Sequence, residues 1–328
     1  MKMYGILCVI TAVIMIVAPL SAISFADSKA KNEEATETET LSQAVESVSE
    51  ESDKDTISVF MTMSNSAQEM DMREYIIGTV AAEMPASYDD EALKAQALAA
   101  VTYAEYQKKN GSKEDIDGAD ISDNSSVHQG YMTKDEMREK WGEAFDTYYQ
   151  KISNAVDAVI DKVITYNGEP IMAAYHAISF STTESAKAVW TVDIPYLSSV
   201  ESKGDADSAR YLSTVTVTDS DLKELMGKDK VSGDGTDIKI NSTSDAGTVT
   251  DMTVCGESIN GTKARELFSL RSPCFSVEYE DGEYTFTVKG YGHGVGLSQY
   301  GADWYAKQGM TYDEIIKHYY TGVEIEER

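Results

Sequence analysis

One carboxyl group in this sequence stands where a general acid would be expected. If the segment is helical, Ile76, Val80 and Glu83 share one face, at spacings of four and three residues. Pro85 disfavours helical backbone at the residue before it, so the helix should end beside Glu83. A carboxyl at the end of an apolar stripe loses hydration, which favours its protonated form and equips it to donate a proton near neutral pH. The alternative is a glutamate at a helix end that faces water.

A second helix is predicted to form a tight corner with the first one. Residues 90–108 are rich in alanine, and small side chains such as Ala95 and Ala99 permit close approach of two helices. Ser87, with Asp90 three residues later, resembles a capping box at the start of this helix. Glu83 would then lie at the corner between the two helices.

A glycine-rich segment near the C-terminus is the other candidate for a binding surface. Glycine occupies every second position from Gly290 to Gly296, which leaves one face of an extended segment without side chains. A bulky ligand or another backbone can approach such a face closely, and His293 projects from between two of the glycines. Neither a dinucleotide fingerprint nor a phosphate loop has this spacing. Ser298 is predicted to cap the helix that follows.

Taken in order, these segments resemble the stage II sporulation protein D and amidase-enhancer family. The resemblance extends over residues 57–325, with shorter matches at 189–190 and 195–197. The motifs that carry it are Tyr75-Ile76-Ile77-Gly78 with Ala82-Glu83-Met84-Pro85, Ala92-Leu93-Lys94-Ala95-Gln96-Ala97, and Gly292-His293-Gly294-Val295-Gly296-Leu297-Ser298-Gln299-Tyr300-Gly301-Ala302. No single motif is decisive, but the order and spacing of the motifs together are specific to the family.

The resemblance implies a lytic transglycosylase that acts on peptidoglycan glycan strands, with Glu83 as both acid and base. Hydrolytic glycosidases normally use two carboxylates, whereas closure of a 1,6-anhydro ring by the sugar's own hydroxyl needs only one. The resemblance further implies a preference for strands already stripped of stem peptides by an amidase, during septal wall remodelling and engulfment of the forespore. The alternative is a non-catalytic wall-binding module that enhances an N-acetylmuramoyl-L-alanine amidase.

Candidate substrate contacts are the aromatic, amide, imidazole and hydroxyl side chains in or near these motifs. Sugars stack on aromatic faces and accept or donate hydrogen bonds. The predicted set is Lys94, Gln129, Tyr131, Tyr175, His176, Thr183, His293, Ser298, Gln299 and Tyr300. For His176 a histidine satisfied within the core is an equal alternative. The chain departs from the family pattern at Val101, where relatives carry an arginine with several fixed donors.

No cofactor is expected, and no metal. Some relatives carry cysteine and histidine in the loop that corresponds to residues 110–127, but here the loop has no cysteine and only His128 follows it. A structural zinc site requires four ligands. The sequence has no His-Glu-x-x-His motif, so a zinc hydrolase has little support. Cys255 and Cys274 could form a disulfide, but two cysteines in so large a domain favour free thiols.

The charge and the N-terminus bear on partners and compartment. A net charge of −28 argues against binding to nucleic acid or to anionic membrane surfaces. A neutral sugar strand would be repelled less strongly than these anionic partners. Residues 1–26 read as a signal peptide or a membrane anchor, and both place the remainder outside the cytoplasm. The family includes membrane-anchored members, which favours the anchor and implies amidase and membrane-protein partners in the engulfment machinery. Residues 27–56 read as an acidic, disordered linker.

The predicted fold class is α+β. We expect a helical catalytic core packed on a mixed β-sheet, formed by residues 57–204 and 290–328, with a small β-rich subdomain inserted at residues 205–289. Residues 57–61 read as the first strand, residues 134–160 as one or two helices, and residues 163–176 as a hairpin with an Asn-Gly turn and a second strand from Pro170 to His176.

Overall fold

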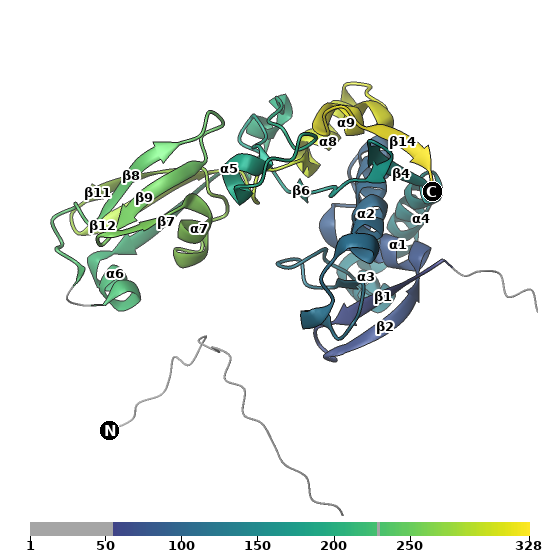
Figure 1. Cartoon of the computed structure of the whole chain (residues 1–328), viewed down its shortest axis with the longest axis horizontal. Coiled ribbons are helices and arrows are strands. Elements are labelled where there is room, and N and C mark those ends of the chain that lie inside the picture. The colour runs from purple at the N-terminus through teal and green to yellow at the C-terminus, as the bar shows by residue number, and fades with distance from the viewer. Residues whose placement is uncertain (1–54, 228–229) are drawn as a thin grey trace, which may run out of the picture. The chain divides into compact units, whose positions relative to one another are not determined.

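The computed structural model describes residues 55–227 and 230–328, and it confirms an α+β fold (Figure 1). The predicted leader and nearly all of the predicted linker lie outside these residues. Across the described part of the chain, no helix combines the length and the apolar character needed to cross a membrane.

The first strands form a mixed sheet, as predicted. Strand β1 (Thr56–Met61) pairs antiparallel with β2 (Ser66–Asp71) and parallel with the short β3 (Ile121–Ser122). The sheet order is therefore β2-β1-β3. Strand β2 leads directly into the first helix, which fixes where that helix begins.

Helices α1 (Met72–Glu83) and α2 (Asp90–Asn110) confirm the predicted helical pair. Helix α1 ends at Glu83 because the backbone becomes extended before Pro85. The predicted capping box from Ser87 is wrong. Asp89 is the N-cap of α2 and accepts the Glu91 N–H at 3.0 Å, and its own backbone N–H donates to Asp303 at 2.8 Å.

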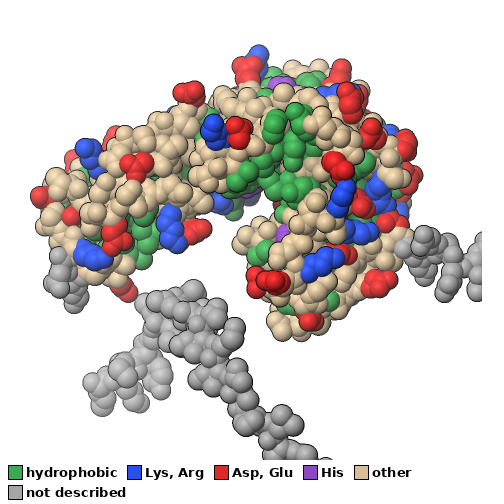
Figure 2. All heavy atoms as spheres, in the orientation of Figure 1, with side chains coloured by type: hydrophobic (Ala, Val, Ile, Leu, Met, Phe, Trp, Pro, Cys, Tyr) green, Lys and Arg blue, Asp and Glu red, His purple; other side chains and the backbone are tan. Residues whose placement is uncertain are grey.

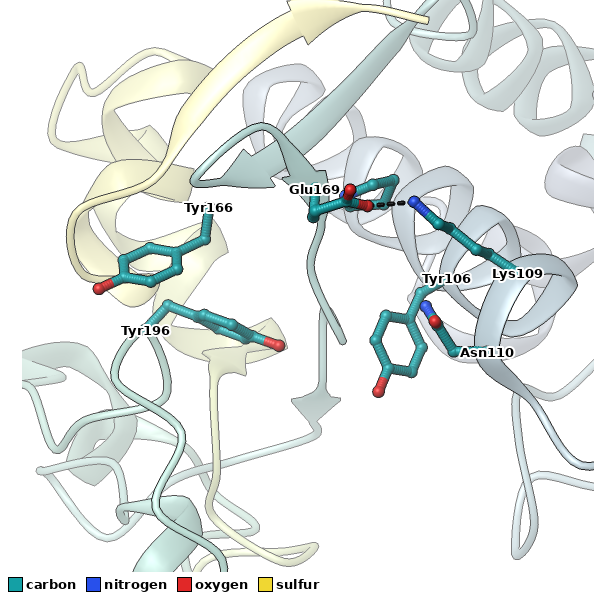
Figure 3. A pocket seen from close by; sticks show the side chains of 7 residues that line it. Tyr106, Lys109, Asn110, Tyr166, Glu169 and Tyr196 are labelled. Atoms are coloured by element: carbon teal, nitrogen blue, oxygen red, sulfur yellow. Dashed lines mark hydrogen bonds and ion pairs between the residues drawn. The ribbon is translucent and has the colours of Figure 1, made fainter.

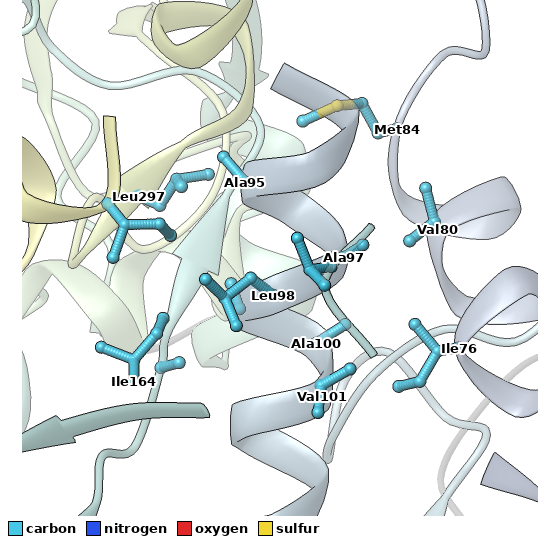
Figure 4. Packing of buried hydrophobic residues seen from close by; sticks show 14 of the residues in the cluster. Ile76, Val80, Met84, Ala95, Ala97, Leu98, Ala100, Val101, Ile164 and Leu297 are labelled. Atoms are coloured by element: carbon cyan, nitrogen blue, oxygen red, sulfur yellow. The ribbon is translucent and has the colours of Figure 1, made fainter. Parts of the chain in front are cut away.

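A large apolar core lies where α1 and α2 meet. Figure 4 shows Ile76 and Val80 of α1 on the side of α2 that carries Ala97, Ala100 and Val101, and all of these side chains are fully buried. Alanine brings the two backbones close together, which leaves little free space in the core. The core therefore holds the end of α1, and with it Glu83, in a fixed position.

Two further helices follow, of which the second packs against α1 and α2 and the first packs against the second. They are α3 (Lys134–Trp141), which begins with a capping box from Thr133, and α4 (Phe145–Asp157), joined by the 3₁₀ turn η2 (Gly142–Ala144). A second 3₁₀ turn, η1 (Glu114–Ile116), lies in the loop after α2. This loop returns the chain to residues 128–131, beside α1.

The predicted hairpin and its Asn-Gly turn are present, but its second strand is shorter than predicted, because Tyr175 and His176 pair with residues 297–298 instead. Strands β4 (Lys162–Tyr166) and β5 (Glu169–Pro170) are joined by Asn167 and Gly168, both with positive φ, as expected of this turn. Strand β14 (Glu324–Glu327) pairs with the other edge of β4. This small sheet ties the C-terminus to the helical core.

The remaining elements of the core bring the glycine-rich segment to the helices. Strand β6 (Tyr175–His176) pairs parallel with β13 (Leu297–Ser298), which leads into α8 (Gln299–Lys307). Helix α9 (Tyr312–Tyr319) follows. Helix α5 (Ala186–Trp190) and the turn η3 (Lys203–Asp207) lie between β6 and the β-rich part.

Residues 212–289 form two three-stranded antiparallel sheets with their own hydrophobic cluster, which includes Leu222, Met252 and Phe286. The first sheet has the order β10-β9-β8 and the second β11-β12-β7. Their elements are β7 (Leu212–Thr218), α6 (Asp219–Met226), β8 (Ile238–Thr243), β9 (Val249–Val254), β10 (Glu257–Ile259), α7 (Gly261–Leu267), β11 (Phe275–Glu280) and β12 (Glu283–Lys289). Cys255 and Cys274 are free thiols. The predicted domain boundaries remain predictions.

Candidate active site

Glu83 is the last residue of α1, and its side chain is half-buried. Its Oε1 accepts a hydrogen bond from the backbone N–H of Gly130 at 2.6 Å. Burial raises the pKa of this carboxyl, while the Gly130 N–H and the Gln299 side chain oppose the rise by hydrogen-bonding to the carboxylate. The group therefore has an environment suited to both protonation states: desolvation favours the acid, and two donors are in place for the base.

Gly130 was missed by the sequence analysis. A Cβ at this position would lie 3.0 Å from Glu83 Oε1 and 3.4 Å from the Ala82 Cβ. The absence of a side chain therefore lets the backbone donor reach the carboxylate. The available signal was a glycine between Gln129 and Tyr131, two residues already predicted to line the groove.

Behind Glu83 lies a hydrogen-bonded group of predicted residues. The Tyr175 hydroxyl donates to Gln129 Oε1 at 2.9 Å, and Gln129 Nε2 donates to the Tyr75 hydroxyl at 3.2 Å. Burial, and after it the charge of Glu83, raises the pKa of Tyr175. Tyr131 stacks on Tyr75 with ring centroids 5.8 Å apart. The structure thus brings Gln129, Tyr131 and Tyr175 together with Tyr75, and the backbone of Gly130 joins this group to Glu83.

Gln299 reaches the site from the start of α8. The pairing of β6 with β13 places Leu297 opposite Tyr175, so the next residues of the chain come toward Glu83. Gln299 is buried, and its Nε2 donates to Gln96 Oε1 on α2 at 3.3 Å. It also lies near Glu83, where its amide lowers the pKa of the carboxyl. Gln299 therefore links the glycine-rich segment to the carboxyl group.

Ser298 has an internal role. As predicted, it caps α8, accepting the Gly301 N–H at 3.2 Å, and its hydroxyl donates to the buried carboxylate of Asp205 at 2.6 Å. Asp205 also accepts a hydrogen bond from Ser179, and burial raises its pKa. These contacts position α8, and the role of Ser298 as a substrate contact remains a prediction.

The glycine-rich segment is approached by the protein's own chain, which was one of the two expected alternatives. A Cβ at Gly290 or Gly294 would overlap the ring of Phe180, and one at Gly296 would overlap the carbonyl oxygen of Ala174. All three residues have positive φ. The glycines therefore allow close packing against residues 174–180, and this packing sets the position of Gln299.

The two histidines form a separate group. His176 is buried and its Nδ1 lies 3.1 Å from the Val295 carbonyl oxygen, while His293 Nδ1 accepts the Val295 N–H at 3.1 Å. The ring centroids are 5.6 Å apart, and Trp190 lies 5.3 Å from His293. Burial lowers the pKa of both, that of His293 to about 4, so both are neutral near pH 7. Neutral rings can accept or donate hydrogen bonds.

The other predicted contacts have internal partners. Lys94 pairs with Glu91 at 2.6 Å on α2, and Thr183 Oγ1 accepts the Val200 N–H at 2.9 Å. The Tyr300 ring meets the edge of Tyr88 at 6.3 Å. Their roles toward a substrate remain predictions.

The loop after α2 contributes no cluster of metal ligands. His128 Nδ1 accepts the backbone N–H of Ser122 at 3.2 Å. Over residues 55–227 and 230–328, no three histidine, cysteine or acidic side chains are grouped as metal ligands would be. The expectation that the protein binds no metal remains a prediction.

Comparisons with known proteins agree with the sequence pattern. A family described as stage II sporulation protein matches residues 61–166. Stage II sporulation protein D of Bacillus subtilis (strain 168) is 36% identical over 334 residues, which cover 100% of this chain and 96% of the relative. Its namesake in Bacillus amyloliquefaciens is 38% identical over 272 residues, covering 83% and 78%. A B. subtilis protein named amidase enhancer is 27% identical over 303 residues, covering 76% of this chain and 40% of the relative.

Proposed function

This chain belongs to the stage II sporulation protein D family, and from that premise we propose that it is a peptidoglycan lytic transglycosylase with Glu83 as acid and base. The observation that carries the proposal is the environment of Glu83. Burial raises the pKa of its carboxyl, and two donors, from Gly130 and Gln299, stabilise the carboxylate.

In the first step, protonated Glu83 gives its proton to the glycosidic oxygen. The bond between that oxygen and the anomeric carbon breaks, and positive charge develops on the sugar ring. As the carboxylate forms, the Gly130 N–H is already hydrogen-bonded to it and the nearby Gln299 amide stabilises its charge, so little reorganisation accompanies the loss of the proton.

In the second step, the Glu83 carboxylate takes the proton from the sugar's 6-hydroxyl. The hydroxyl oxygen bonds to the anomeric carbon and closes the 1,6-anhydro ring, which returns Glu83 to its acid form. No water molecule and no second carboxylate takes part. One half-buried carboxyl is therefore sufficient for the whole cycle.

We propose denuded glycan strands as the substrate, produced by an amidase partner during septal remodelling and engulfment of the forespore. The net charge of −28 supports this choice, because strands that keep their acidic stem peptides would be repelled more strongly. The proposal places the protein outside the cytoplasm, held at the membrane by residues 1–26 or secreted if they are cleaved, near other membrane proteins of the engulfment machinery.

The test is mass spectrometry of the soluble products from amidase-treated peptidoglycan. We expect Glu83→Gln to reduce the release of anhydro-ended glycans by about 100-fold or more, the usual contribution of a general acid. The matched control is Glu74→Gln, an exposed glutamate on the same helix that pairs with Arg73, and it should keep near-native activity. If the native protein releases no anhydro product, the proposal fails.

A second candidate is a non-catalytic enhancer of an amidase. It is favoured by the relative named amidase enhancer and by Val101, which is fully buried and supplies no donor where relatives carry arginine. This reading predicts that Glu83→Gln stimulates an amidase as well as the native protein does. Stimulation measured together with product release separates the two functions.

A further inference from the structure

A cavity of about 390 Å³ lies at the C-terminal end of α2 (Figure 3). Residues from three separate parts of the chain line it: Tyr106, Lys109, Asn110, Tyr166, Glu169, Pro170 and Tyr196. Glu83 and the residues that contact it are not among them. The cavity is therefore a feature additional to the candidate active site.

The chemistry of the lining suits a neutral, hydroxyl-rich ligand with apolar faces. Three half-buried tyrosine rings surround the space, and those of Tyr166 and Tyr196 have centroids 5.4 Å apart at 52°. The only cation in the lining, Lys109, forms an ion pair with Glu169, so the lining carries no net charge. A pyranose ring, with a C–H face and equatorial hydroxyls, matches aromatic faces bordered by polar groups.

Donors and acceptors for those hydroxyls are present. The Tyr196 oxygen accepts the Met172 N–H at 3.1 Å, which leaves its own proton available for donation. Asn110, the last residue of α2, adds an amide with both donor and acceptor atoms. An anionic ligand is disfavoured, because the cation is already neutralised and the chain carries a large negative charge.

The cavity is connected to the site through α2. Gln129, beside the Gly130 donor to Glu83, contacts the Ala100 carbonyl of α2, with Nε2 3.4 Å from that oxygen. Tyr106 is six residues farther along the helix, about 9 Å at the helical rise. The two places therefore lie at different points along α2, and only a ligand longer than one sugar could occupy both.

We propose that this cavity is a distal saccharide subsite, which binds a sugar of the same glycan strand some way from the bond that is cleaved. The proposal rests on the proposed glycan-strand substrate. Its consequence is a preference for long strands, because a short fragment that occupies Glu83 does not reach the tyrosines.

The test measures binding alone, in a Glu83→Gln background that does not consume the ligand. Peptide-free glycan strands and a single disaccharide repeat are titrated against this protein, with and without Tyr106→Ala. We expect Tyr106→Ala to weaken the binding of long strands by about three- to tenfold, the effect of losing one aromatic contact, with disaccharide affinity unchanged. Asn110→Ala, which removes no ring from the core, should weaken long-strand binding in the same direction.

The matched control is Tyr148→Ala, a half-buried tyrosine of α4 that does not line the cavity. It should leave long-strand affinity unchanged. Equal long-strand affinity in the Tyr106→Ala, Asn110→Ala and Tyr148→Ala proteins would overturn the subsite while leaving the proposed function intact. Failure of the Glu83→Gln protein to bind any glycan, with no product from the native protein, would overturn both.

Discussion

At the scale of single residues, the chemistry depends on a balance at one carboxyl group. Burial raises the pKa of Glu83, and hydrogen bonds from Gly130 and Gln299 hold it below the value that burial alone would give. The proposed reaction requires the protonated form at the start of each cycle. The alkaline limb of the pH–rate profile should therefore report the pKa of Glu83.

Replacing Gln299 by leucine removes one donor to the carboxylate. The remaining influences then favour the acid more strongly, so the pKa of Glu83 rises and the alkaline limb should move to higher pH. The measurement is the rate of anhydro-product release as a function of pH. Gln308→Leu, an exposed glutamine just after the same helix, is the control and should not move the limb. If the alkaline limb of the pH–rate profile stays in place or moves to lower pH in Gln299→Leu, Gln299 does not stabilise the Glu83 carboxylate as proposed.

At the scale of elements, the glycine-rich segment acts through packing. Its glycines have positive φ and lie against residues 174–180, which leaves Gln299 near Glu83. A side chain here faces two separate penalties, one from the left-handed backbone and one from steric overlap.

Two glycine substitutions separate these penalties. Gly296 has φ 75° and a Cβ there would overlap the Ala174 carbonyl, whereas Gly309 has φ 94° with no other described atom within 4 Å of a Cβ. We expect Gly309→Ala to lower the free energy of unfolding by about 1 kcal/mol. Gly296→Ala should lower it by about 3 kcal/mol or more, because overlap adds to strain. Urea unfolding measures both, and equal losses would contradict close packing at Gly296.

At the scale of the whole molecule, the net charge bears on the proposed substrate. The net charge is −28, and Figure 2 shows acidic side chains spread over the visible face of the described residues. A distributed charge of this size repels anions over distances set by the ionic strength, and affects a neutral strand little.

Salt should therefore change the discrimination between two kinds of strand. The length over which salt screens charges falls from about 30 Å at 0.01 M salt to about 8 Å at 0.15 M. We expect the Glu83→Gln protein to bind peptide-bearing strands more tightly as salt rises over this range, while its affinity for peptide-free strands changes little. Titration of both strands at both ionic strengths gives the answer. The same salt dependence for both would show that net charge does not set the preference.

Much of the local structure was predictable from the sequence, because its causes are local. Pro85 ends α1 at Glu83, Asn167 and Gly168 make the turn of the hairpin, and Ser298 caps α8. Each of these depends on a few neighbouring residues. The α+β class and the position of the candidate acid followed from such signals.

Only the tertiary structure decided what surrounds that acid. Gly130 donates to Glu83 across 47 positions of sequence, and Gln299 arrives from the far end of the chain. The cavity likewise combines Tyr106, Tyr166 and Tyr196, none of which stands out in its own segment. Local sequence fixes backbone conformation, whereas a long-range contact depends on how whole elements pack, and no single segment encodes that packing.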